Sequence, residues 1–95
     1  MDFGKAIKQV RKEKKIKQKE LSDITGLSVN AISEIELGKS IPQKETLNKI
    51  AKGLDIPKSY IFFLCLTEDD VSEDKRQVFN VLKNSLSDLI LTTIK

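Results

Sequence analysis

Apolar residues recur at helical spacing along the whole chain, and no segment alternates apolar and polar positions as a half-buried strand does. The first such stripe, Phe3, Ala6, Ile7 and Val10, predicts a helix over about residues 3–14. The same spacing predicts five further helices, marked by Leu21 and Ile24; Ala31, Ile32 and Ile35; Leu47, Ile50, Ala51 and Leu54; Tyr60 to Leu66; and Val78, Val81, Leu82, Leu86, Leu89 and Ile90. The pattern therefore predicts an all-α chain.

Residues with strong preferences for helix ends set the boundaries. Gly26 is suited to a left-handed C-terminal cap, so we expect the second helix to stop there. Ser28 can cap the N-terminus of the third helix, which should end just before Gly38. Ser72 is placed as the N-cap of a final helix that runs to about Thr93.

The second and third helices are separated only by a tight turn at residues 25–28. Two short helices joined by a turn of three or four residues with a glycine describe a helix-turn-helix, whose second helix enters the DNA major groove. The third helix, at about residues 29–37, has one apolar side that would hold it on the scaffold. Its other side would face DNA bases and consists of Val29, Asn30, Ser33 and Glu34.

These four side chains have distinct abilities to recognise bases. Asn30 can pair with adenine through two hydrogen bonds, and Glu34 can accept one from the amino group of cytosine. Val29 can pack on a thymine methyl group, whereas Ser33 can bond to any base or to a phosphate. Because a carboxylate repels phosphates, Glu34 would lower general DNA affinity while it discriminates between bases.

Residues 18–56 resemble the DNA-binding domain of the phage Cro and repressor family, also called Xre-type regulators, and the likeness extends over about residues 3–64. Its landmarks are Gln18, Gly26, Ser28, Ile32, Glu36, Gly38 with Lys39, Pro42 and the stretch ETLNKIA. The resemblance implies a five-helix repressor-like DNA-binding domain over residues 1–66, with the helix-turn-helix at about 18–37. An additional C-terminal helix would follow it.

The resemblance also implies roles for single residues. Gln18 opens the second helix, where family members contact a DNA phosphate, and helix N-termini present free N–H groups to such anions. The residues expected to contact phosphates are Lys17, Gln18, Ser28, Lys39 and Ser40. Arg11 and Glu36 occupy positions where family members form a partly buried ion pair between the first and third helices. Such a pair mainly fixes orientation, because desolvation offsets much of its attraction.

Three residues depart from the family's pattern. Lys17 stands where a capping Ser or Thr is common, Ser22 replaces a common alanine, and Asp55 replaces the glycine that often ends the fourth helix. Aspartate enters left-handed geometry more readily than most residues. These departures affect local stability and leave the fold unchanged.

Charge is distributed unevenly although the net charge is only +3. Residues 1–20 contain eight Lys or Arg against three Asp or Glu, whereas residues 65–95 contain four against six. A basic N-terminal segment suits binding to a polyanion such as DNA. The alternative is that its lysine-rich face is simply solvated.

Residues 67–95 are expected to form an acidic linker and a helix that pairs two copies of the chain, because dimers of this class read two half-sites about one turn apart, ~34–36 Å. The expected contact residues are Phe62, Val78, Phe79, Leu82, Leu86, Leu89 and Ile90. The alternative is that this helix folds back and completes its own subunit.

The composition argues against catalysis and metal binding. The chain has no histidine, a single cysteine (Cys65), no glycine-rich phosphate loop and no pair of residues spaced as nucleophile and base, so we expect no enzyme, no metal and no cofactor. Cys65 is most simply a small apolar residue. With no signal peptide and no apolar run near the ~20 residues of a membrane span, a cytoplasmic location is expected.

The sequence thus favours a sequence-specific regulator that binds a palindromic double-stranded DNA operator as a homodimer. It would be a repressor if its operator overlaps a promoter. The alternative is a protein-interaction module, either an antitoxin that neutralises a toxin or a coactivator that bridges proteins. The polar outward side of the third helix and the basic first helix favour DNA, and the apolar tail leaves room for a different protein partner.

Overall fold

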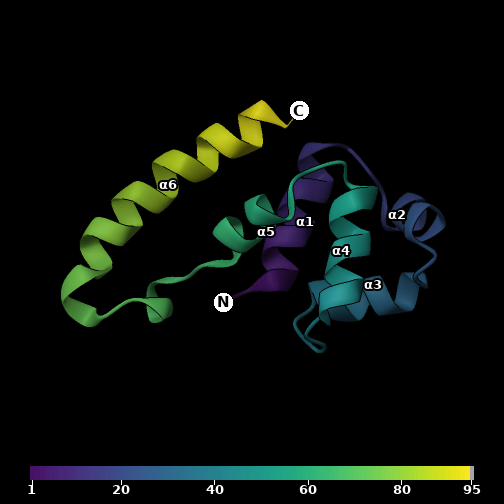
Figure 1. Cartoon of the computed structure of the whole chain (residues 1–95), viewed down its shortest axis with the longest axis horizontal. Helices are drawn as coiled ribbons and strands as arrows, with labels where there is room; N and C mark the ends of the chain where they lie inside the picture. Colours follow the sequence, from purple (N-terminus) through teal and green to yellow (C-terminus); the bar gives the residue numbers. More distant parts are fainter. Residues whose placement is uncertain (95) are drawn as a thin grey trace.

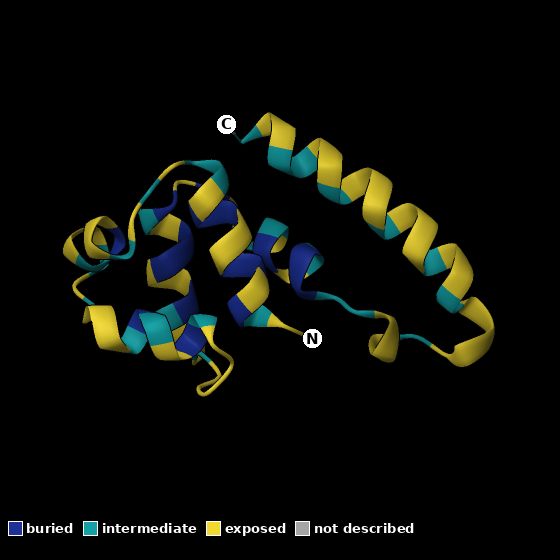
Figure 2. Cartoon of the chain, turned by 180° about the vertical axis from the view of Figure 1, so that it is seen from behind, coloured by how far each residue is buried: buried dark blue, intermediate teal, exposed yellow. Residues whose placement is uncertain are grey.

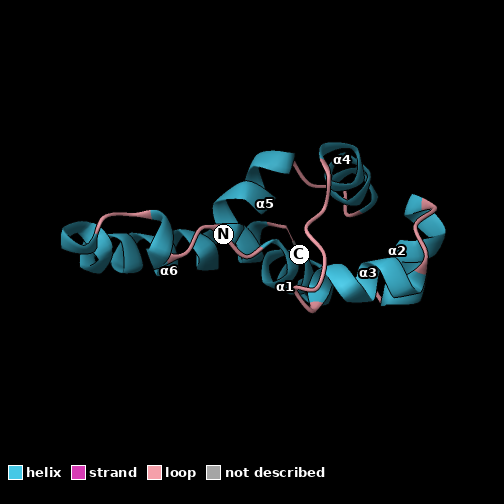
Figure 3. Ribbon diagram, turned by 90° about the horizontal axis from the view of Figure 1, so that it is seen from below, coloured by secondary structure: helices cyan, strands magenta, loops and turns pink. Residues whose placement is uncertain are grey.

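The computed structural model describes residues 1–94, which form six α-helices and two short 3₁₀ turns with no strand among them (Figures 1 and 3). The helices are α1 (Phe3–Glu13), α2 (Gln18–Thr25), α3 (Val29–Glu36), α4 (Lys44–Gly53), α5 (Lys58–Cys65) and α6 (Arg76–Thr93). The turns η1 (Glu68–Asp70) and η2 (Glu73–Lys75) connect α5 to α6. The predicted all-α fold, five helices followed by one more, is confirmed.

Helices α1 to α5 form a bundle around one apolar core. α1 packs on α3 and α5, α2 packs on α3 and α4, and α4 packs on α5. The buried apolar residues are Ala6, Ile7, Val10, Leu21, Ile32, Ile35, Leu47, Ile50, Ala51, Leu54, Ile56, Ile61, Leu64 and Cys65. Every one of them lies in this bundle, which therefore encloses its own core.

A close approach between α1 and α3 requires a glycine at position 4. A Cβ atom on Gly4 would lie 2.2 Å from the carbonyl oxygen of Ile35 and 2.9 Å from that of Glu36. No side chain fits at that distance, so the backbone of α1 rests directly against the last turn of α3. Gly4 thereby sets the position of α3 on the bundle.

The expected helix ends in the bundle are confirmed. Gly26 caps α2 in the left-handed conformation with φ 77°, and Gly38 has φ 79° directly after the cap of α3. The Ser28 hydroxyl accepts a hydrogen bond from the Ala31 N–H at 3.0 Å. Asp55 enters left-handed geometry with φ 54°, as its place at the end of α4 suggested.

Leu21 and Ile24, the two apolar residues that mark α2 in the sequence, differ in burial. Leu21 is fully buried, whereas Ile24 is 59% exposed. α2 meets α4 at Gly53, where a Cβ atom would lie 2.8 Å from Cγ2 of Thr25 and 3.3 Å from Cγ2 of Ile24. Ile24 thus lies at the edge of this narrow contact, where α4 covers only part of it.

The predicted capping role of Ser72 at the start of α6 is wrong. Ser72 precedes η2 and its side chain makes no capping hydrogen bond, and α6 begins only at Arg76. Two consecutive 3₁₀ turns occupy the stretch in which the sequence suggested a single acidic linker.

Polar contacts hold α6 to the rest of the chain. The Lys83 ammonium donates hydrogen bonds to the carbonyl oxygens of Leu64, at 2.8 Å, and of Leu66, at the C-terminal end of α5. It also lies 5.7 Å from the centre of the Phe63 ring. Burial lowers the pKa of Lys83. Asn80 donates to the Glu68 carboxylate at 2.9 Å, so both side chains fasten α6 to the end of α5 and to η1.

Apolar packing of α6 on the bundle is confined to the C-terminal part of the chain. Ile90, Leu91 and Ile94 contact the core and are only partly buried. No residue of α6 is fully buried, and Figure 2 shows the helix as a partly covered stripe with an exposed outer side. The helix therefore folds back on its own subunit without completing the core.

Candidate nucleic-acid interface

The turn between α2 and α3 is fixed by side-chain hydrogen bonds as well as by Gly26. The Thr25 hydroxyl donates to the Leu21 carbonyl oxygen at 2.7 Å and accepts from the Leu27 N–H at 3.2 Å. The Ser22 hydroxyl donates to the Leu27 carbonyl oxygen at 2.6 Å. Ser22, a departure from the family's usual alanine, therefore ties α2 to the chain entering α3.

α3 has one buried side and one exposed side. Ile32 and Ile35 are 1% and 4% exposed and anchor the helix in the core. On the other side Val29 is 38% exposed, and Asn30 and Glu34 are exposed as well. Ser33, the fourth residue expected to face DNA bases, is half-buried. The predicted two-sided helix is present, with Val29, Asn30 and Glu34 its most accessible members.

A buried ion pair joins α1 to the end of α3. The Arg11 Nε donates to the Glu36 carboxylate at 2.7 Å, and a terminal nitrogen of Arg11 donates to its other oxygen at 2.8 Å. The two side chains are 10% and 3% exposed. The hydrogen bond from Arg11 to Glu36 raises the pKa of the guanidinium. Arg11 also donates to the Ile16 carbonyl oxygen at 2.9 Å, so it fastens the chain between α1 and α2 as well.

Gln18 belongs to the same network. Its side-chain amide donates to the Glu36 carboxylate at 3.1 Å, the oxygen that Arg11 also reaches. A glutamine amide has two N–H groups, so one is engaged by Glu36 while the second N–H stays available to another acceptor. Glu36 thus holds residues from α1 and α2 at the end of α3 and orients the amide at the start of α2.

The remaining residues expected to contact phosphates flank α2 and α3. Lys17, Ser28, Lys39 and Ser40 are all exposed. The Lys17 backbone N–H donates to the Glu20 carboxylate at 3.3 Å, and that of Lys39 donates to a backbone oxygen of α3 at 2.9 Å. Their ammonium groups therefore extend from backbone positions that are fixed by hydrogen bonds.

The segment that follows α3 contains an apolar residue which the sequence did not single out. Ile41 is 80% exposed and borders a shallow groove of about 270 Å³ together with Glu34, Pro42 and Gln43. A helical period cannot identify such a residue, because Ile41 lies between two helices. Ile41 therefore adds exposed apolar surface next to the exposed side of α3.

Of the residues of α6 that were expected to pair two copies of the chain, some are exposed and others are partly buried. Val78, Leu82, Leu86 and Leu89 are 63%, 55%, 42% and 62% exposed. Phe79 and Ile90 were expected in the same contact, but both are partly buried: Phe79 borders the cavity between α6 and α1, and Ile90 packs against the core. The reason is that α6 docks along one edge of its apolar stripe, which hides those two residues and leaves the other four uncovered.

Phe62 was also expected in this contact. It is 39% exposed and its ring packs edge-on against Phe3 of α1, with ring centres 5.8 Å apart. The neighbouring residue Phe63 contacts α6, because the Lys83 ammonium lies over its ring.

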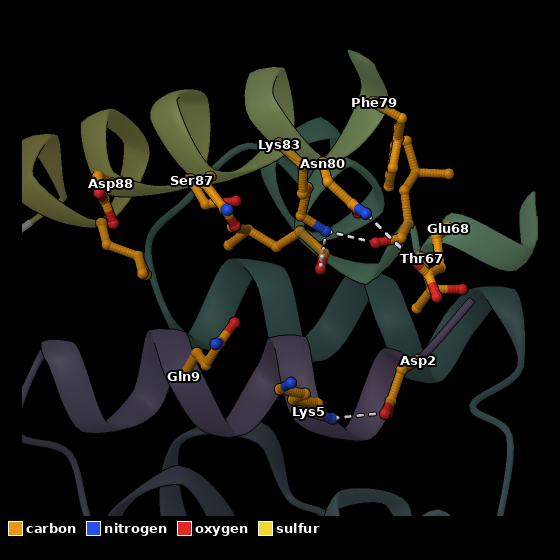
Figure 4. Close-up of a pocket in the computed structure, with 14 residues that line it drawn as sticks. Asp2, Lys5, Gln9, Thr67, Glu68, Phe79, Asn80, Lys83, Ser87 and Asp88 are labelled. Atoms are coloured by element: carbon orange, nitrogen blue, oxygen red, sulfur yellow. Dashed lines mark hydrogen bonds between the residues drawn. The ribbon is translucent and has the colours of Figure 1, made fainter. Parts of the chain in front are cut away.

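A cavity of about 330 Å³ lies between α6, α1 and the chain that follows α5 (Figure 4). Its lining is mostly polar, with Lys5 and Gln9 from α1 opposite Asn80, Lys83 and Asp88 from α6. Figure 4 shows Asn80 and Lys83 pointing from α6 toward the segment around Thr67. α6 thus presents much of its polar surface to its own chain.

Three further observations concern metal ligands, membrane-spanning helices and the single cysteine. Residues 1–94 contain no group of three or more His, Cys, Asp or Glu side chains placed to hold a metal ion. Over the same range, no helix combines the length and hydropathy that crossing a membrane requires. Burial raises the pKa of the Cys65 thiol, which suits a residue that packs in the core.

Comparison with known proteins identifies similar chains. Residues 7–61, more than half of the chain, match the profile of a helix-turn-helix family. The "ImmF control region 10 kDa protein" of Bacillus phage phi105 is 44% identical over 72 residues, which cover 76% of this chain and 77% of that protein. The "HTH-type transcriptional repressor RghR" of Bacillus subtilis is 32% identical over 72 residues, which cover 75% of this chain and 53% of RghR.

A second group of similar proteins is named for a different role. "Multiprotein-bridging factor 1" of Candida albicans is 42% identical over 56 residues, which cover 59% of this chain and 37% of that protein. The match therefore spans little more than a third of the bridging factor and about half of RghR. No solved structure matches the chain.

Proposed function

The chain belongs to the Cro- and repressor-type helix-turn-helix family of DNA-binding transcription regulators, and from this we propose that it is a sequence-specific repressor. It would bind an inverted repeat in double-stranded DNA as a homodimer, with α3 in the major groove of each half-site. Repression follows if that site overlaps a promoter, because the bound protein then excludes the polymerase.

One observation carries this proposal: α3 is a rigidly held helix whose exposed side can recognise bases. Ile32 and Ile35 anchor it, Ser28 caps it, and the buried Arg11–Glu36 pair fixes its end against α1. A helix that is held by packing and hydrogen bonds loses less conformational entropy on binding than a mobile one, so its exposed side chains can recognise bases at a lower cost.

Each exposed side chain then has a proposed partner. Asn30 would pair with adenine, Glu34 with cytosine, and Val29 with a thymine methyl group, while Ser33 would bond to a base or to a phosphate. The phosphate contacts would come from Lys17, Gln18, Ser28, Lys39 and Ser40. Of these, Gln18 would use the N–H that Glu36 leaves available, so the ion pair also orients a phosphate contact.

Selection of bound duplexes from a random DNA pool at near-physiological salt tests the proposal. We expect enrichment of one sequence in two inverted copies. Enrichment of a single half-site would retain specific binding and remove the homodimer. No enrichment by folded protein would contradict DNA recognition altogether.

Two observations favour a second candidate, a protein-interaction module such as an antitoxin or a coactivator. The outer side of α6 is apolar and uncovered, and one group of similar proteins is named for bridging proteins. Purification of the chain from its native lysate separates the candidates, because a stoichiometric second protein would support the module and its absence the repressor.

A further inference from the structure

The cavity between α6, α1 and the chain that follows α5 is lined in part by polar groups that have no partner within the protein (Figure 4). The Ser87 hydroxyl oxygen is buried and makes no hydrogen bond to the described chain, which is rare for a buried polar atom. Four more side chains in the lining make no hydrogen bond or ion pair with the described chain: Lys5, Gln9, Asn84 and Asp88. They come from two helices and border one cavity, so a single bound molecule can reach several of them.

The charges around the cavity have both signs. Lys5 and Lys83 carry positive charge. The carboxylates in the lining are those of Asp2, Glu68 and Asp88, and only that of Asp88 accepts no hydrogen bond from the described chain. A cation alone would therefore lie near two ammonium groups, and an anion alone would lie near three carboxylates. A molecule that carries one charge of each sign suits both sets.

The two ammonium groups form the positive part of the cavity. Lys83 donates two of its three N–H groups to the carbonyl oxygens of Leu64 and Leu66, so one N–H is left for another acceptor. Burial lowers the pKa of Lys83, and the positive charge of Lys5 lowers it further. The two ammonium groups thus repel each other. A carboxylate between them would accept the remaining N–H and offset this repulsion.

We propose that the cavity binds a short zwitterion with about the span of a dipeptide, whose carboxylate lies between Lys5 and Lys83 and whose ammonium faces Asp88. Asp88 follows Lys83 on α6 and lies about 7.5 Å further along the helix axis at 1.5 Å per residue. Two extended residues span about 7 Å, so the charged ends of a dipeptide match this separation.

The size and lining of the cavity fit such a molecule. Its volume of about 330 Å³ is at the lower end of the ~300–1,000 Å³ of small-molecule sites. The amides of Gln9 and Asn84 can bond to the peptide group of the ligand, and Phe79 and Leu91 add apolar surface for small side chains. The Ser87 hydroxyl can turn toward the ligand by rotation about one torsion angle, and it would then gain the partner that it lacks.

This site is separate from the proposed DNA interface, because α2 and α3 lie on the side of the bundle away from α6 (Figures 1 and 3). The ligand would contact α1 and α6 at once. No residue of α6 is fully buried, so a bridge of this kind should add to the contacts that hold the helix on the bundle. The zwitterion would therefore restrict the opening of α6 and leave the side chains of α3 unobstructed.

NMR titration of the isotope-labelled full-length chain with L-alanyl-L-alanine tests the site. This dipeptide should bind on the order of millimolar, as a ligand with few atoms does, and shift the backbone amide signals of Lys5, Gln9, Lys83 and Ser87 to saturation. It should also slow amide hydrogen exchange in α6. N-Acetyl-L-alanyl-L-alanine lacks the ammonium and L-alanyl-L-alaninamide lacks the carboxylate, so each should bind about tenfold more weakly.

Three variants separate binding in the cavity from general charge effects. Lys5→Met and Asp88→Asn each remove one charged contact at an exposed position, so the fold should be unchanged and the dipeptide should bind about tenfold more weakly. Lys8→Met removes a lysine of α1 that is exposed and does not line the cavity, so it should leave the affinity unchanged.

Each other outcome overturns the proposal. Equal binding of the acetylated or the amidated peptide would show a site for a single charge instead of a zwitterion. Equal loss of affinity in Lys8→Met would show that the dipeptide responds to general charge. Absence of saturable shifts with L-alanyl-L-alanine above the millimolar range would show that the lining groups are simply solvated. In each of these cases, duplex selection by the same protein still tests the repressor function independently.

Discussion

The bundle α1–α5 and the helix α6 differ in where their apolar and charged side chains lie. In the bundle, apolar residues fill one core, and the buried charges of Arg11 and Glu36 bond to each other. In α6 no residue is fully buried and four large apolar residues stay more than half exposed (Figure 2). The charged Lys83 points toward the end of α5 (Figure 4). The difference indicates that the bundle encloses the core, whereas α6 adds only partly buried residues to it and keeps an exposed apolar side.

The largest expected effect comes from breaking the ion pair in the bundle. Glu36→Ala leaves the Arg11 guanidinium buried without its partner, so the free energy of unfolding should fall by about 3–5 kcal/mol. Urea denaturation measures it. The control is Lys19→Ala, which removes an exposed pair with Asp23 and should cost less than about 0.5 kcal/mol. A loss below about 1 kcal/mol for Glu36→Ala would show that the pair is not truly desolvated.

A smaller loss is expected where α1 rests on α3. Gly4→Ala adds a Cβ atom 2.2 Å from the Ile35 carbonyl oxygen, so α1 must shift away from α3. Overpacking of this kind typically costs about 1–3 kcal/mol, and thermal unfolding measures it. DNA affinity should also fall in protein that remains folded, because α3 moves. An unchanged melting temperature would contradict the close approach.

Loosening α6 should leave the bundle intact. Lys83→Met keeps an unbranched side chain but removes the hydrogen bonds to the carbonyl oxygens of Leu64 and Leu66. Amide hydrogen exchange should show α6 opening more readily, by about 1–2 kcal/mol, while α1 to α4 keep their protection. Lys75→Met, at an exposed position outside the α5–α6 contact, is the control. Equal loss of protection in α1 to α4 would contradict the independence of the bundle.

The smallest expected effect concerns a single phosphate contact. Lys39→Ala should weaken binding to all DNA sequences alike and reduce the slope of log affinity against log salt by about one. Titration of one duplex at several salt concentrations measures this slope. Lys52→Ala, which removes an exposed lysine of α4, should leave the slope nearly unchanged. Equal slopes for Lys39→Ala and the unaltered chain would remove Lys39 from the contact.

Most features that depend on local sequence were predictable, with the N-cap expected at Ser72 as an exception. Helical periodicity gave the fold class, and the preferences of Gly26 and Ser28 placed the ends of α2 and α3 because each acts within one turn of its own helix. The two sides of α3 follow from the same period. The pairing of Arg11 with Glu36 joins residues 25 positions apart, and only the resemblance to a known family pointed to it.

Features that depend on how helices meet were not predictable. Gly4 looks like an ordinary glycine until α3 lies against it, and Ile24 looks like a core residue until α4 leaves it at an edge. The division of the α6 stripe is of the same kind, because periodicity does not tell which edge docks. The amide of Gln18 reaches Glu36 only once α2 and α3 are placed together.

Repeating the duplex selection with Asn30→Ala beside the unaltered chain tests the central claim, that the exposed side of α3 reads base sequence. Asn30 is exposed and outside the core, so stability should not change. We predict the same inverted repeat with the preference lost at one base pair per half-site, where discrimination falls by about 1–3 kcal/mol. An unchanged preference at every base pair, or an equal loss of affinity for all sequences, would contradict base recognition by Asn30.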